Sequence, residues 1–257
     1  MKKGILLLVT AFLLCMPLAA RAASHPSGPG PEDPAFTGTG YYERIRAFLD
    51  RTNDLMASLD LKFQDTRVSP IIRSDEWIEV PMEFGCMGTE DQLLPVLEKL
   101  SGYSFADSRC SLKALCISVS AENAPSGHPL LTVNLQCALV AGKGIATADW
   151  PLAFNRRLTR AMDALLRLTT FRPQIRKRVQ GGGLEGGPTW VTNLRVDGDG
   201  RVQITGYGAG LDAKVVTALG SALLKSGAFL EVFLSNMSRN VYEKHPVWRF
   251  DLTGKLP

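Results

Sequence analysis

The spacing of apolar residues predicts a regular alternation of helices and strands along most of the chain. Apolar residues three and four positions apart, as on one face of a helix, recur in four segments: 41–60, 89–102, 151–172 and 211–225. Alternating or apolar-rich runs, typical of strands, lie around them: 63–72, 77–84, 112–121, 130–139, 189–196, 201–207, 229–235 and 247–253. The pattern therefore predicts an α+β protein.

Local signals mark several element boundaries. Thr89 and Gln92 predict a capping box, because each side chain can satisfy a backbone N–H that the first helical turn leaves unpaired. Gly102 is expected to end that helix. Pro81 has no N–H to donate to a neighbouring strand, which predicts that its strand lies at a sheet edge. Asp197-Gly198 predicts a hairpin turn.

The order of the predicted elements is the same in residues 41–142 and 149–257: helix, strand, strand, helix, strand, strand. This order is a circular permutation of the ferredoxin-like unit, a four-stranded antiparallel sheet with two helices on one face. We therefore expect two tandem permuted ferredoxin-like domains. Weak sequence echoes accompany the repeat: Gly88, Leu97 and Ser101-Gly102 in the first half, and Gly210, Leu219 and Ser226-Gly227 in the second.

The first 22 residues have the features of a secretory signal peptide. Lys2 and Lys3 precede an apolar run from Ile5 to Ala20, and Ala20-Arg21-Ala22 offers a cleavage site. The run is shorter than the ~20 residues that a membrane helix needs. We expect cleavage after Ala22 or Ala23, followed by a flexible leader over residues 23–40 that is rich in Pro, Gly and Ser. The expected location is the periplasm; the alternative is an inner-membrane anchor formed by an uncleaved segment.

Charge argues against nucleic acid as a partner. The formal net charge of +4 falls to +1 when Lys2, Lys3 and Arg21 are removed with the signal peptide. Segment 151–180 contains eight basic residues and only one acidic residue, Asp163, so it carries a formal charge of +7 and leaves −6 for the rest of the mature chain. Four arginines in the predicted helix are candidates for binding a partner: Arg156, Arg157, Arg160 and Arg167. They form either a solvated helix face or a docking surface for an acidic protein or for anionic lipid headgroups.

The cysteines allow two interpretations. Four remain after cleavage, an even number that suits an oxidising compartment: Cys86, Cys110, Cys116 and Cys137. They are either disulfide-bonded or buried thiols. The strand alternation places Cys86 and Cys137 toward the first core as a candidate buried pair, and gives Cys116 the opposite phase, which leaves it to Cys110 or to solvent.

No pattern in the sequence indicates an active site. His25, His128 and His245 lie far apart in the chain, and no cysteine has the spacing of a metal ligand, so we expect no catalytic residues, metal or cofactor. Gly206, Gly208 and Gly210 have the spacing G-x-G-x-G, which differs from a dinucleotide-binding loop and is expected to form a strand-to-helix turn. The chain is therefore not expected to be an enzyme.

Residues 189–257 share one pattern of apolar and small residues: Trp190, Leu194, Val202-Gln203-Ile204, Gly206, Ser226-Gly227-Ala228-Phe229, Val232, Leu234 and Phe250-Asp251-Leu252. This pattern resembles the periplasmic domain of PilN, a protein of type IV pilus assembly that is related to type II secretion components. The first half, with its helix, the strand 77–84 and the following helix, is similar to PilO, the usual partner of PilN. PilN proteins begin with a cytoplasmic tail and a membrane helix, whereas this chain begins with a predicted signal peptide.

The resemblance implies a non-enzymatic scaffold in the periplasm. It implies that ferredoxin-like domains pair with one another, as homodimers or heterodimers, or with subunits of a pilus or secretion machine. Contact with a membrane surface is a further expectation. The alternative is a periplasmic binding or adaptor module that shares only the fold and has no link to pili.

Overall fold

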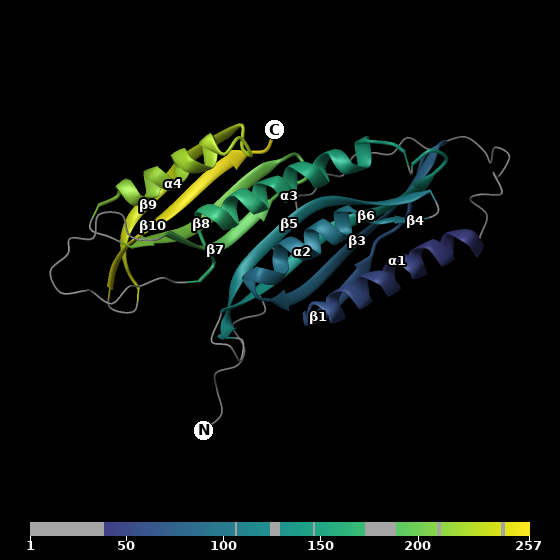
Figure 1. The fold of residues 1–257 in the computed structure, drawn as a ribbon, viewed down its shortest axis with the longest axis horizontal. Coiled ribbons are helices and arrows are strands. Elements are labelled where there is room, and N and C mark those ends of the chain that lie inside the picture. The colour runs from purple at the N-terminus through teal and green to yellow at the C-terminus, as the bar shows by residue number, and fades with distance from the viewer. Residues whose placement is uncertain are drawn as a thin grey trace, which may run out of the picture. The chain divides into compact units, whose positions relative to one another are not determined.

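Four helices and ten strands alternate along the part of the chain that the computed structural model describes, which comprises residues 39–105, 107–123, 129–145, 147–172, 189–209, 212–242 and 245–257 (Figure 1). The helices are α1 (Thr39–Ser58), α2 (Glu90–Ser101), α3 (Trp150–Leu168) and α4 (Lys214–Lys225). The strands are β1 (Lys62–Val68), β2 (Ile72–Arg73), β3 (Trp77–Gly88), β4 (Ser104–Phe105), β5 (Ser108–Asn123), β6 (Pro129–Gly142), β7 (Thr189–Val196), β8 (Arg201–Ala209), β9 (Glu231–Tyr242) and β10 (His245–Lys255).

All ten strands belong to one antiparallel sheet. Its main path runs β1-β3-β6-β5-β7-β8-β10-β9, with β2 beside β3 and β4 beside β5. The long strands of each half follow the same spatial order, namely first, second, fourth and third. The predicted α+β class is therefore confirmed. The two halves do not form separate sheets, however, because β5 of the first half pairs with β7 of the second.

Each half carries a β-bulge in its first strand and another in its third. In the first strands the extra residues are Gln64 of β1 and Thr192 of β7. In the third strands they are Lys113 of β5 and Ser235 of β9. A bulge places two residues opposite one and twists the strand locally, so it serves as a fixed reference point for register.

The helices cover one face of the sheet and share a single core with it. Buried residues of all four helices belong to one apolar cluster together with alternate residues of the strands, such as Met82, Phe84 and Leu135. A smaller cluster on the opposite face joins Ala138, Val140 and Ile145. Residues 38–257 form one compact unit, and the main apolar cluster contains residues of both predicted domains.

Helix α3 lies at the junction between the halves. It packs on β5 and contacts both α2 and α4. The apolar residues Leu158, Met162 and Leu165 are buried, whereas Leu168 at the helix end is 39% exposed. Helix α3 opens the second half in sequence, yet its main strand contact is with β5 of the first half.

The junction combines a short strand pairing with a buried side chain. Leu115–Ser118 of β5 pair with Asn193–Val196 of β7, and β4 pairs with the first residues of β5. Between these two pairings, the side chain of Asn155 in α3 forms hydrogen bonds with the backbone of β5. Its Oδ1 accepts the Leu112 N–H at 2.7 Å and its Nδ2 donates to the Cys110 carbonyl at 2.8 Å. Asn155 is 1% exposed, so it satisfies backbone groups that water does not reach.

Helix α2 begins as its sequence predicts, and its first residue also ties the halves together. The Thr89 N–H donates to Gln92 Oε1 at 2.6 Å. Glu90 Oε2 accepts hydrogen bonds from Thr170 Oγ1 at 2.6 Å and from the Phe171 N–H at 2.9 Å. The segment after α3 is thus attached to the start of α2, a role that the sequence did not indicate.

The prediction that Pro81 marks a sheet edge is wrong. Strand β3 lies between β1 and β6, and Pro81 pairs with Ala138 of β6. On its other side, β1 ends opposite Met82 and β2 begins opposite Glu79. Pro81 therefore lies beside the end of β1, where its carbonyl accepts a hydrogen bond from the Ser69 N–H at 2.9 Å, and its missing N–H falls between the paired residues of β1 and those of β2.

Candidate interaction surfaces

The two edges of the sheet expose an unusual amount of apolar surface. In β1, β2 and the residues between them the exposed large apolar residues are Phe63, Val68, Ile71 and Ile72, and in β9 and the turn before it they are Leu230, Phe233, Leu234 and Val241. Phe233 is 59% exposed and Val241 is 67% exposed. Contiguous exposed apolar residues of this kind mark surfaces that bind other proteins.

The two edges differ in how they are protected against pairing. Strand β1 is short and carries the charged residues Lys62, Asp65 and Arg67, so it selects against a partner strand that would place like charges or large apolar residues beside them. Strand β9 has 12 residues, and between Val232 and Ser238 it carries no charge. Within the described residues no strand pairs with the outer side of β9. Its backbone groups are therefore available to a partner strand.

The four candidate arginines lie on α3, and three of them are already engaged. Arg156 makes two hydrogen bonds of 2.9 Å to Asp149, and this guanidinium holds the pKa of the Asp149 carboxyl below its usual range. Arg167 pairs with Asp163 at 2.9 Å. Arg157 donates to the Pro257 carbonyl and lies over the Phe154 ring.

Arg160 is exposed and makes no ion pair within the described part of the chain. Of the other basic residues in 151–180, Arg172 is exposed, and those at 176–178 lie outside the described residues. The arginine surface stays a prediction, with less uncompensated charge than the sequence implied.

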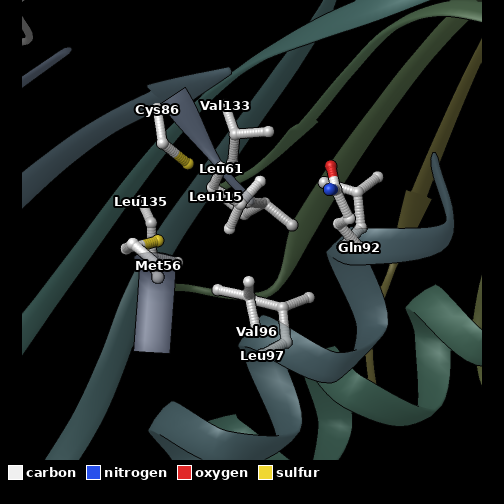
Figure 2. Close-up of a pocket in the computed structure, with 10 residues that line it drawn as sticks. Met56, Leu61, Cys86, Gln92, Val96, Leu97, Leu115, Val133 and Leu135 are labelled. Atoms are coloured by element: carbon white, nitrogen blue, oxygen red, sulfur yellow. The ribbon is translucent and has the colours of Figure 1, made fainter. Parts of the chain in front are cut away.

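The interior of the first half contains a small apolar void. It measures about 10 Å³ and lies between α2 and the sheet, where Met56, Cys86, Leu97 and Leu135 are among its lining residues (Figure 2). Figure 2 shows Gln92 at its margin. A void of this size holds about one water molecule, so it is no site for a small-molecule ligand.

The register of the sheet separates the predicted cysteine pair. Cys86 lies opposite Val133, whereas Cys137 lies opposite Met82, four residues away along β3. The candidate pairing of Cys86 with Cys137 is therefore wrong. Cys137 instead shares a hydrogen bond with the thiol of Cys110, and this contact, followed by burial, raises the pKa of Cys137 well above its ordinary value.

The remaining cysteines follow the predicted phases. Burial raises the pKa of the Cys86 thiol to about 11. Cys116 is exposed and points away from the core, as its strand phase predicted. All four described cysteines are thiols in this structure, and disulfide formation stays a prediction.

These environments predict selective alkylation. In the folded chain without its first 22 residues, a thiol reagent at pH 8 should modify Cys116 and leave the three buried cysteines unmodified until denaturant is added. A thiolate is the reacting species, and a pKa near 11 lowers its population at Cys86 more than ~100-fold relative to an ordinary thiol. Intact-mass measurement counts the adducts, and Cys116→Ser is the control that should abolish native labelling. Two or more adducts on the folded protein would contradict the burial of Cys86, Cys110 and Cys137.

Other candidate sites are placed differently from the sequence expectation or lie outside the described residues. Gly206 and Gly208 lie within β8 rather than in a turn, and Gly210 is not described. Close neighbours leave no room for a side chain at either position. A Cβ on Gly206 would meet the Trp190 carbonyl and the Phe250 ring, and one on Gly208 would meet Val215 at 2.8 Å.

His245 is exposed at the start of β10, while His25 and His128 are outside the described residues. In the described ranges, no three His, Cys, Asp or Glu residues lie close enough to hold a metal ion. None of the helices that the structure describes combines the length and the apolar character required to cross a membrane.

Comparison with solved structures finds a partial likeness. No family model matches the chain, and no curated protein matches it. Among solved structures, the type 4 fimbrial biogenesis protein PilO from Pseudomonas aeruginosa is similar over 40% of this chain and 71% of the PilO chain, with 15% sequence identity and a TM-score of 0.34. The finding supports a weak PilO-like resemblance and gives no support for the predicted PilN-like one.

Proposed function

We propose that this chain is a non-enzymatic assembly protein of the bacterial envelope, which binds other proteins through the edges of its sheet. The observation that carries the proposal is the exposed apolar residues at the two edges, with Phe233 and Val241 on β9, whose outer side pairs with no strand among the described residues. Strand addition to such an edge gives affinity through main-chain hydrogen bonds, while apolar side chains give specificity. The void of Figure 2 offers no alternative small-molecule site.

The proposed setting is the periplasm, and the proposed machine is a type IV pilus or a type II secretion-like assembly. Export rests on Lys2-Lys3, the apolar run from Ile5 to Ala20 and the cleavage site Ala20-Arg21-Ala22. The pilus link rests on the PilN-like and PilO-like sequence patterns. We further propose that the halves are tandem permuted ferredoxin-like units, which is supported by their shared strand order and by the bulges in the first and third strands of each.

A photo-crosslinking amino acid in place of Phe233 tests the proposal in the native bacterium. We expect covalent adducts with envelope assembly proteins, recovered from the periplasmic or envelope fraction and attached to a chain that starts at Ala23 or Ser24. The same amino acid in place of Gln203, an exposed residue of β8 away from both edges, is the matched control and should give no adduct.

Three outcomes would overturn parts of this proposal. Equal or absent adducts at both positions would reject the edge as a binding surface. Adducts that contain only proteins unrelated to pili or secretion would favour the adaptor alternative. A chain that retains Met1 and stays in the cytoplasm would reject export.

A further inference from the structure

The internal junction shows which residues become buried when a first strand joins a third strand. Counted from the bulges, the second residue after Lys113 of β5 is Leu115, and the fourth residue after Thr192 of β7 is Val196. These two residues are partners across the junction and are 1% and 3% exposed. The junction therefore joins a third strand to a first strand in a register that the bulges define.

The free edges of the sheet are the other first strand and the other third strand. Strand β9 is the third strand of the second half, and β1 is the first strand of the first half. The same count from their bulges gives Met237 of β9 and Val68 of β1. The sheet of one chain thus has a free first strand at one edge and a free third strand at the other. These are the two kinds of strand that pair at its internal junction.

Equivalent apolar positions are buried at the junction and exposed at the free edges. Val191, just before the bulge of β7, is 0% exposed, whereas Phe63 in the same position of β1 is 42% exposed. Val196 is 3% exposed and its counterpart Val68 is 51% exposed.

The third strands show the same contrast. Leu112, just before the bulge of β5, is 0% exposed and its counterpart Leu234 in β9 is 37% exposed. All of these positions lie on the helix-covered side of the sheet, because their partners in the neighbouring strands, such as Cys86 and Leu252, belong to the core. The free edges therefore lack the cover that the junction provides.

The cover at the junction consists of a helix followed by a strand. Helix α3 packs on β5, and β7 pairs with it. A partner that covers β9 in the same way must offer a helix and a first strand in that order. Helix α1 and strand β1 of a second copy offer this order, with apolar residues left exposed along β1.

We propose that a second copy of this chain continues the sheet, with β9 of one copy pairing antiparallel with β1 of the next. This inference rests on the proposed function, because it names the partner that the edges bind. Counted from the bulges, the partners are Met237 with Val68, Ser238 with Arg67, Arg239 with Thr66, and Asn240 with Asp65. No like charges face one another in this register.

The contact is heterologous, since it joins two different surfaces of the same molecule. Each copy that binds through β9 still exposes its own β1, so the association does not close on itself in the way a two-fold dimer does. The expected product is a head-to-tail series of chains that share one sheet.

Cysteine cross-linking in the mature chain distinguishes this arrangement from others. In a Cys116→Ser background, the double variant Val68→Cys with Met237→Cys is treated with a short thiol-specific bifunctional reagent at ~100 μM protein. A denaturing gel should show a ladder of dimer, trimer and higher species. A mixture of the two single variants should give dimers only, because each chain then carries one reactive end.

The controls fix both the register and the pairing mode. Val68→Cys with Val241→Cys tests a position four residues along β9 and should give at least fivefold less cross-linked product. Adding Leu234→Lys to the reactive double variant should abolish the ladder, and unchanged circular dichroism would show that this exposed substitution leaves the fold intact. Dimers from either single variant alone would show two-fold edge pairing and overturn the inference, as would monomers throughout. If the double variant gave no ladder while the photo-crosslinker at position 233 still captured other envelope proteins, the pairing between copies would be rejected and the proposed function would stand.

Discussion

Replacing Asn155 by alanine should lower the free energy of unfolding by about 2–4 kcal/mol, although it removes only one polar side chain. The change leaves the Leu112 N–H and the Cys110 carbonyl without partners in a site that water does not reach. Each buried backbone group that loses its hydrogen bond costs roughly 1–3 kcal/mol. Urea denaturation followed by circular dichroism measures the change.

Asn53→Ala is the matched control for this prediction. Asn53 is an exposed residue of α1, and alanine has the higher helix propensity, so this variant should be neutral or slightly stabilised. Asn155→Asp should destabilise at least as much as Asn155→Ala, because it removes the donor to Cys110 and buries a carboxylate. A loss below about 0.5 kcal/mol for Asn155→Ala would mean that β5 finds other partners for these groups.

Replacing Gly206 by alanine should destabilise the protein by about 1–3 kcal/mol, although the substitution adds only one methyl group. The added Cβ would overlap the Trp190 carbonyl of the neighbouring strand and would lie 2.7 Å from the Phe250 Cζ. Backbone cannot move out of the way as a flexible side chain can, so β7 and β8 must separate locally. The thermal melting temperature and the urea midpoint should both fall.

Gly40→Ala provides a control of opposite sign. Gly40 is the second residue of α1, and a Cβ there has nothing within 4 Å. Alanine should leave the stability unchanged or raise it by up to ~1 kcal/mol. If both glycine variants behaved alike, the close approach at Gly206 would not be the cause of its effect.

The sequence predicted the elements well where a local signal sets the boundary. Gln92 caps α2 as its spacing from Thr89 implied, and Leu158, Met162 and Leu165, which lie at helical spacing, are among the buried residues of α3. The errors arise where tertiary partners decide the outcome. Pro81 is tolerated in a central strand because two short neighbours leave a gap beside it, and no local pattern reveals where a neighbouring strand ends.

The candidate sites were predicted less completely than the fold. Strand phase placed Cys116 at the surface, but it could not say which inward cysteine lies beside Cys137, since that depends on the β5–β6 register. The importance of Asn155 was also missed, because an asparagine in a helix gives no sign of the strand that it will contact. Counting charges identified the arginines of α3 but not the residues that they pair with, such as Asp149, which pairs with Arg156.

The position of α3 means that sequence order and packing divide the molecule at different places. By sequence, the first half ends with β6 at Gly142. By packing, it is completed only by α3, which covers β5 with Leu158 and Asn155, and by the attachment of Phe171 to Glu90. A fragment that stops at Gly142 would expose part of its own core, whereas one that continues through Phe171 retains its cover. The two halves thus share one helix, and the first half is not a self-contained folding unit when it is cut at Gly142.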